Sequence, residues 1–357
     1  MAKGPGASSG RRLEAVASCA AVRWEPAMLQ QKALGAVGGW RRKGRAGHGL
    51  GLATACVVGI APWCFWLAPS HSQILSPAVA PPSAAPYSNP QVQEVVGLVQ
   101  AAATAVRARG EGAFADFRRR GAPWFQGERY VFVLSTEGKS LVYPPQPSRE
   151  GTNYLGFEDL GGKRFGRQFV AVAQAPPGRG WVHYQWRRPN PADRRPVWKA
   201  TYLETVTAPS GQTYLVLSGL YDPPMERAFV LQEVDAAAEL LQTQGREGFE
   251  QLRDQRSRFF YQDAYVFVLS AQGQLLVNPA FPALEGRNLL ELAEPNEKKN
   301  AQASLGSVLA RGSVWTTYNW PRPDHTTLRE RKTTFLRRVV LPGGETLIVG
   351  SGLYADF

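Results

Sequence analysis

Cysteine and histidine are scarce in this chain of 357 residues. The three cysteines, Cys19, Cys56 and Cys64, all lie near the N-terminus, so the sequence beyond them can form neither a disulfide nor a Cys-ligated metal site. Beyond residue 71 the only histidines are His183 and His325, too few for a His-based metal site within one domain. We therefore expect no metal and no other cofactor, and a fold that suits any redox compartment.

Familiar catalytic motifs are also missing. The sequence contains no Gly-x-Ser-x-Gly, no His-Glu-x-x-His and no phosphate-binding glycine loop. His325 lies in a proline-rich stretch that predicts a surface turn. His183 alternates with Tyr184, which places it toward solvent or on the back of a sheet. These features argue against an enzyme.

A net charge of +12 raises the hypothesis of nucleic-acid binding. Residues 1–48 hold nine Lys or Arg and two Glu, which is +7 and leaves +5 for the other 309 residues. The positive charge is therefore concentrated in a basic N-terminal segment, residues 1–48, that we predict to be disordered. We expect no nucleic-acid partner.

Residues 49–68 carry no charge over a length of about one bilayer crossing. The basic run Arg41–Arg45 precedes them, and Trp63 and Trp66 lie near their far end, as in an interfacial belt. By the positive-inside rule, this segment is a transmembrane signal anchor or a signal peptide that exports everything after it. We expect inner (plasma) membrane anchoring with periplasmic or extracytoplasmic domains, or secretion to the periplasm if the segment is cleaved.

Cleavage and the start residue stay open. Residues 78–80 (Ala-Val-Ala) are typical of a cleavage site, but Pro81 directly after them disfavours processing, so an uncleaved anchor is the preferred interpretation. Met28 is an alternative to Met1 as the start. Residues 69–90 are rich in Pro, Ala and Ser and predict an extended linker.

The rest of the chain repeats itself once, at a spacing of about 135 residues. A period of this length matches a whole small domain and is too long for a solenoid repeat. We predict two copies of one domain, at residues 91–222 and 223–357. The recurring blocks are Tyr130–Ser135 with Tyr265–Ser270, the pattern of Trp181, Tyr184 and Trp186 with that of Trp315, Tyr318 and Trp320, and Ser218–Tyr221 with Ser351–Tyr354.

Each copy opens with a helical pattern and continues with strands. Apolar residues at helical spacing predict a helix over 92–120 and another over 225–244, interrupted at Gly245. Runs of strands without crossover helices predict an antiparallel sheet in an α+β fold. In the first copy the aromatic and β-branched runs predict strands at 130–135, 141–143, 181–186, 197–206 and 213–221.

Together these blocks resemble the single Cache type 2 domain, a PAS-like extracellular sensor of bacterial chemoreceptors and histidine kinases. The resemblance implies a five-stranded antiparallel sheet with a long N-terminal helix behind it. It also implies a pocket between the sheet and a helix-and-loop excursion, for small organic molecules and often short carboxylates. The family often has a His-Pro pair after the first hairpin, whereas this chain has Tyr143-Pro144 and Asn278-Pro279. The resemblance rests on the following features: the entry helix, the Tyr-Val-Phe-Val hairpin, Glu285–Leu290, the Trp-x-x-Tyr-x-Trp strand, the lysine strand and the closing Gly-Leu-Tyr.

The candidate ligand-binding residues lie on two neighbouring strands of each copy. A Tyr and a Trp two residues apart share one strand face, and their apolar bodies with polar ends suit a pocket. A lysine on the next strand supplies a charge for a carboxylate, and the first copy adds an arginine as a second cation. Alternating aromatics are also typical of an ordinary core, and that alternative stays open. The candidates are Tyr184, Trp186, Lys199 and Arg164 in the first copy and Tyr318, Trp320 and Lys332 in the second.

The sequence thus predicts a membrane-tethered periplasmic sensor that binds a small organic ligand. It would act through a separate signalling or transport partner, because no output domain follows the second copy. The long alanine-rich helices suit a homodimer. The alternative is a structural or protein-interaction protein with degenerate Cache pockets, which the missing His-Pro pairs favour.

Overall fold

The computed structural model describes residues 87–121, 123–189, 195–324 and 327–354. The predicted basic segment 1–48, the membrane segment 49–68 and most of the linker 69–90 lie outside these residues. None of the helices in the described part of the chain has the length and hydropathy that a bilayer crossing requires.

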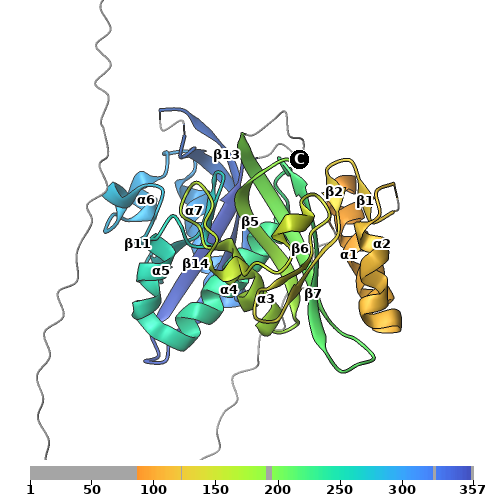
Figure 1. Cartoon of the computed structure of the whole chain (residues 1–357). Helices are drawn as coiled ribbons and strands as arrows, with labels where there is room; N and C mark the ends of the chain where they lie inside the picture. The colour runs from red at the N-terminus through yellow and green to blue at the C-terminus, as the bar shows by residue number, and fades with distance from the viewer. Residues whose placement is uncertain (1–86, 122, 190–194, 325–326, 355–357) are drawn as a thin grey trace, which may run out of the picture. The chain divides into compact units, whose positions relative to one another are not determined.

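The first domain is built on an antiparallel sheet with the strand order β4-β3-β7-β6-β5, of which Figure 1 shows β7, β6 and β5 side by side. A long helix packs on one face, and a helix-and-loop excursion between β4 and β5 covers the other. Its helices are α1 (Pro90–Arg109), α2 (Phe114–Arg118) and α3 (Phe165–Gln174). Its strands are β1 (Phe125–Gln126), β2 (Arg129–Tyr130), β3 (Phe132–Ser135), β4 (Ser140–Val142), β5 (Arg179–Arg187), β6 (Pro196–Thr207) and β7 (Thr213–Tyr221).

The second domain repeats this plan, with the strand order β11-β10-β14-β13-β12. The predicted α+β class, with two tandem PAS-like domains that each carry a five-stranded antiparallel sheet, is therefore confirmed. Its helices are α4 (Arg227–Gln244), α5 (Phe249–Arg253), α6 (Leu289–Leu292) and α7 (Lys298–Arg311). Its strands are β8 (Phe260–Tyr261), β9 (Ala264–Tyr265), β10 (Phe267–Ser270), β11 (Leu275–Val277), β12 (Ser313–Pro321), β13 (Arg329–Val340) and β14 (Thr346–Leu353).

The long helices begin and end where local chemistry dictates. Asn89 caps α1 by accepting a hydrogen bond from the Gln91 amide at 2.8 Å, and Pro90 occupies the first turn, where its missing N–H is no loss. Gly110, with φ of 55°, ends the helix, so the helix predicted over 92–120 is broken there. Gly245, with φ of 60°, ends α4 in the same way, as the sequence predicted.

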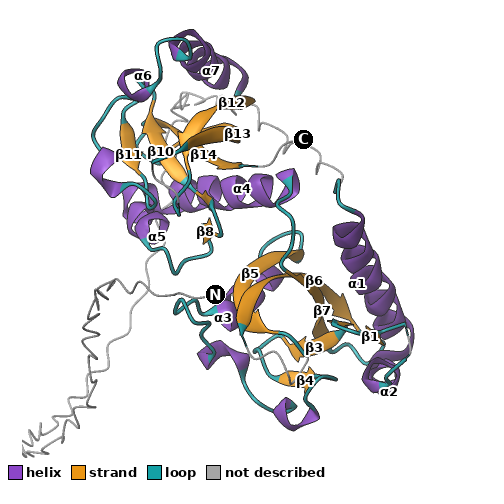
Figure 2. Ribbon diagram, turned by 90° about the horizontal axis from the view of Figure 1, so that it is seen from above, coloured by secondary structure: helices purple, strands orange, loops and turns teal. Residues whose placement is uncertain are grey.

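The strands divide each domain into two cores. In the first domain Val131 and Val133 face α1, while Phe132 and Leu134 face the excursion, because successive strand residues point to opposite sides of a sheet. Figure 2 shows α1 lying along one side of this sheet. The candidate residues Tyr184 and Trp186 belong to the excursion side. The excursion face of the first domain therefore carries its candidate residues.

Candidate ligand-binding sites

The strand register places the candidate lysines directly opposite the candidate tyrosines. On the β5–β6 pair Tyr184 faces Lys199, and on the β12–β13 pair Tyr318 faces Lys332. Residues directly opposite on an antiparallel pair lie on the same sheet face. Both lysines are almost fully shielded from solvent, with exposures of 1% for Lys199 and 0% for Lys332.

In the first domain, phenol hydroxyls surround the lysine ammonium. Lys199 Nζ donates to the Tyr130 hydroxyl at 2.8 Å and, more weakly, to the Tyr221 hydroxyl at 3.4 Å. The same Nζ lies 4.4 Å from the centre of the Tyr130 ring, a cation–π contact. Burial lowers the pKa of Lys199 to about 7, opposed by the charge of Glu128.

Tyr184 and Trp186 take part in the aromatic packing beside this lysine. Tyr184 stacks on Phe165 with ring centres 4.3 Å apart. Trp186 Nε1 donates to the Tyr143 hydroxyl at 3.1 Å, and that hydroxyl lies 3.3 Å from the Tyr130 hydroxyl. A continuous polar chain therefore runs from the Trp186 indole to Lys199 through a face that is otherwise filled by rings.

The first domain also has a cavity of about 690 Å³ at one end of this face. Trp186 and Tyr143 line the cavity, together with the excursion residues Asp159 and Leu160, whereas Lys199 and Tyr184 do not line it. Arg164 is more than half exposed and pairs with Glu158 at 2.7 Å, so the structure does not bring it together with Lys199.

In the second domain the lysine lacks the partners that Lys199 has. Within the described part of the chain, Lys332 Nζ has no hydrogen-bond partner. It lies 3.9 Å from the centre of the Tyr265 ring and 4.8 Å from that of Tyr354. Burial lowers the pKa of Lys332 to about 7, opposed by the charge of Asp263.

A small apolar cavity adjoins the second site. Its volume is about 30 Å³, and one water molecule requires roughly 10–15 Å³. Tyr318 and Trp320 line it on the sheet side. Burial raises the pKa of Tyr318 to about 12, so its hydroxyl stays protonated and available as a donor. Helices α6 and α7 supply Leu289, Asn300, Ala301, Ser304 and Leu305 on the other side.

The two departures from the His-Pro pattern account for part of the difference between the sites. Tyr143 joins the hydroxyl chain that reaches Lys199. Its counterpart Asn278 is buried but accepts a hydrogen bond from the Phe281 amide at 3.0 Å, which closes a local turn. The second site therefore has no hydroxyl from this position.

Four tyrosines that lie against the two lysines were not among the predicted site residues: Tyr130, Tyr221, Tyr265 and Tyr354. Tyr130 and Tyr265 end β2 and β9, Tyr221 ends β7, and Tyr354 directly follows β14. The signal was present, because both copies place a tyrosine at each of these two positions. Periodicity alone could not show that these rings lie against Lys199 and Lys332.

Two tandem PAS-like domains, each with a five-stranded antiparallel sheet, are the architecture that the resemblance to Cache sensor domains implied. The family model described as the Cache domain matches residues 119–207 and 237–357, more than half of the chain. The chain therefore belongs to the Cache family, whose members are extracellular or periplasmic ligand-binding sensor domains. A search of curated proteins gives no match.

Several solved structures are similar to parts of the chain. A periplasmic sensor domain of a chemotaxis protein is 31% identical, covering 36% of this chain and 95% of its own, with a TM-score of 0.32. A Cache chemosensory domain described for carboxylic acid recognition is 20% identical, covering 37% and 94%, with a TM-score of 0.31. A methyl-accepting chemotaxis protein from Vibrio parahaemolyticus is 18% identical, covering 37% and 88%, with a TM-score of 0.31.

Proposed function

We propose that this protein is an extracytoplasmic sensor that binds a small organic carboxylate in its second domain, with Lys332 as the cation that pairs with the carboxylate. The observation that carries the proposal is the Lys332 ammonium, which is 0% exposed and lacks a hydrogen-bond partner among the described residues. A buried charge without a partner destabilises a fold by several kcal/mol. A bound carboxylate supplies the missing charge and acceptor.

The surroundings of Lys332 favour a short ligand. Tyr318 lies across from Lys332 on the same sheet face and also lines the small cavity, which Lys332 itself does not line. Binding would require a shift of Tyr318 that joins the cavity to Nζ. Trp320 then covers the apolar end of the ligand, and the Tyr318 hydroxyl adds a donor for a carboxylate oxygen.

The first domain is the weaker candidate within the same proposal. Lys199 donates to Tyr130, so a ligand carboxylate there must compete with an existing hydrogen bond. Tyr184 and Trp186 would form the wall of that site. Arg164 is not part of the proposal because it pairs with Glu158 at the surface.

The remaining parts of the proposal come from the sequence. The segment 49–68 would tether the protein to the inner membrane, and a separate partner would receive the signal. The helices α1 and α4 would be the surfaces of a homodimer. Ligand binding would act by shifting the population between an open and a closed site, without chemistry.

The alternative, an interaction protein with degenerate pockets, has one observation in its favour. Aromatic rings fill the sheet face around Lys199, and Tyr130 already satisfies the ammonium. This observation applies to the first domain. The second domain, with its unpartnered lysine, favours the sensor.

A thermal-shift screen of the purified protein tests the proposal. The panel consists of short mono- and dicarboxylates, amino acids, amines and purines. We expect a short carboxylate to raise the melting temperature by mass action, and Lys332→Met to abolish that rise. Lys299→Met, which removes an exposed lysine of α7, is the matched control and should respond like the unchanged protein. A rise that survives in Lys332→Met, or a panel with no active compound, would contradict the proposal.

A further inference from the structure

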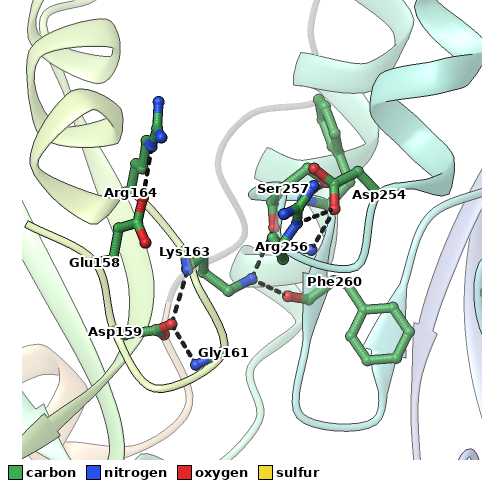
Figure 3. A network of polar contacts seen from close by, with 10 residues as sticks. Glu158, Asp159, Gly161, Lys163, Arg164, Asp254, Arg256, Ser257 and Phe260 are labelled. Carbon is green, nitrogen blue, oxygen red and sulfur yellow. Dashed lines mark hydrogen bonds and ion pairs between the residues drawn. The ribbon is translucent and has the colours of Figure 1, made fainter. Parts of the chain in front are cut away.

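The excursion loop of the first domain, Glu158–Arg164, is fixed to the strand that carries Tyr184 and Trp186. The Asp159 carboxylate accepts hydrogen bonds from the amides of Gly161 at 2.8 Å and Lys163 at 2.9 Å (Figure 3). Its other oxygen accepts from the Gln185 amide of β5 at 2.9 Å. The loop and the strand therefore move together.

The same loop reaches into the second domain through one buried lysine. Lys163 is 3% exposed, and its Nζ donates to the backbone carbonyl of Ser257 at 2.7 Å and to that of Phe260. Figure 3 shows the side chain pointing from its loop toward these two carbonyls. Burial lowers the pKa of Lys163 to about 8, opposed by the charges of Asp159 and of two acidic groups of the second domain.

The fit of the loop against the second domain is close. A Cβ added at Gly162, where φ is 78°, would lie 3.2 Å from the Arg256 side chain. Arg256 is itself held by Asp254, which accepts from its Nε at 3.0 Å. A displacement of the loop must therefore displace the segment around Ser257 or break the lysine hydrogen bonds.

From Phe260, two further contacts lead to the candidate ligand site. Phe260 pairs with Tyr265 in the β8–β9 hairpin, and their rings are stacked with centres 6.0 Å apart. The Tyr265 ring in turn lies 3.9 Å from Lys332 Nζ. The chain Lys163–Phe260–Tyr265–Lys332 thus links the first-domain loop to the second-domain ammonium by direct contacts.

The Glu158–Arg164 loop also forms part of the wall of the first-domain cavity. Glu158, Asp159 and Leu160 line the first-domain cavity of about 690 Å³, and the Leu160 side chain is 73% exposed. Trp186 lines the same cavity. A molecule that enters the cavity contacts the loop that carries Lys163.

From this chain of contacts we infer that the position of the Glu158–Arg164 loop sets the affinity of the Lys332 site, with Lys163 as the positioning residue between the two domains. The inference rests on the proposed carboxylate site. Because coupling between two sites is reciprocal, a carboxylate bound at Lys332 also restricts the first-domain loop. The two domains then act as one regulated sensor.

The test compares the carboxylate dissociation constant of the whole protein with that of Lys163→Met, by calorimetric titration. Methionine retains much of the apolar stem and removes the two hydrogen bonds to the second domain. We expect the affinity to fall by at least about fivefold, the lower end of typical allosteric coupling. Lys139→Met, at an exposed position of the first domain, is the control and should bind within twofold of the unchanged protein.

The two proposals fail in distinguishable ways. Binding that is lost in Lys332→Met but unchanged in Lys163→Met overturns the coupling and leaves the carboxylate site intact. If no carboxylate binds, hydrogen exchange still tests the coupling. Asp159→Ala, which frees the loop, should speed exchange at the amides of residues 261–266, and this effect should vanish in the Lys163→Met background. An equal effect in both backgrounds would overturn the inference.

Discussion

The two domains place a lysine at the same register position and give it different surroundings. Lys199 donates to Tyr130 at 2.8 Å, whereas Lys332 has aromatic rings and no hydrogen-bond partner among the described residues. Both ammonium groups are buried to the same degree. The two copies therefore share the scaffold, while their local contacts differ: Lys199 has hydrogen-bond acceptors and Lys332 has none among the described residues.

The difference extends to the space beside each lysine. The first domain has a large open cavity that Lys199 does not line, and the second has a small apolar cavity that is lined by Tyr318, the residue opposite Lys332, but not by Lys332 itself. A small cavity lined by the tyrosine opposite an unpartnered cation suits a short carboxylate. A large cavity walled by an interdomain loop suits regulation. Under the proposed function, the two copies of one fold therefore have different tasks.

The largest difference that we expect between the two lysines is in how their substitution changes the free energy of unfolding. Lys332→Met removes a buried amine without a hydrogen-bond partner and should raise the free energy of unfolding of the ligand-free protein by about 1–3 kcal/mol. Lys199→Met should raise the free energy of unfolding by less, because it also removes the donor of an existing hydrogen bond. Urea denaturation at neutral pH measures both.

The gain from Lys332→Met should also depend on pH in a defined direction. The pKa of Lys332 is about 7 in the folded protein, against an ordinary value of 10.5. The unfolded chain therefore binds more protons between these values, and the stability of the unchanged protein rises with pH across that window. The advantage of Lys332→Met should shrink from pH 7 to pH 10.5. A variant that is less stable than the unchanged protein at pH 7 would contradict this account.

The next effect concerns the tyrosines. Tyr130→Phe removes the nearer of the two acceptors of Lys199 and leaves only the Tyr221 hydroxyl at 3.4 Å, which should destabilise the protein by about 1–3 kcal/mol. Tyr265→Phe removes no hydrogen-bond acceptor from Lys332 and should have a smaller effect. The two substitutions are compared by chemical denaturation. Equal losses would show that the lysine surroundings do not differ in the way described.

The smallest effect is the pH dependence of binding. A carboxylate pairs with the protonated form of Lys332, whose pKa in the free protein is about 7. The affinity should therefore be constant below pH 7 and fall by up to about tenfold per pH unit above it. Calorimetric titrations between pH 6 and 8.5 check this slope. An affinity that rises across this range would exclude a carboxylate–lysine pair.

Local patterns predicted the scaffold of each domain. The strand predicted over 213–221 is β7, where Tyr214 and Val216 pack on one face of the sheet and Leu215 and Leu217 on the other. The predicted interruption at Gly245 is confirmed, because the positive φ of 60° at Gly245 ends α4. The helix that was expected to continue through Gly110 ends there. Gly110 adopts a positive φ of 55°, and the spacing of apolar residues does not predict such a conformation.

The contacts between the domains were beyond the reach of these patterns. His183 lies on the back of the sheet, one of its two expected places, but it is buried against Tyr261 with ring centres 3.9 Å apart. Lys163 was not among the predicted site residues, because a lysine in a polar loop is ordinarily solvated. Its acceptors are 94 and 97 residues away in the chain, a separation that no local pattern encodes.

The most direct measurement is the pKa of Lys332 itself, from an NMR titration of its ammonium group with and without the carboxylate that emerges from the screen. In the free protein the pKa should lie near 7, because burial disfavours the charged form. With the carboxylate bound it should rise, because an adjacent anion favours the ammonium. A pKa that is the same in both states would show that the ligand does not pair with Lys332 and would contradict the central claim.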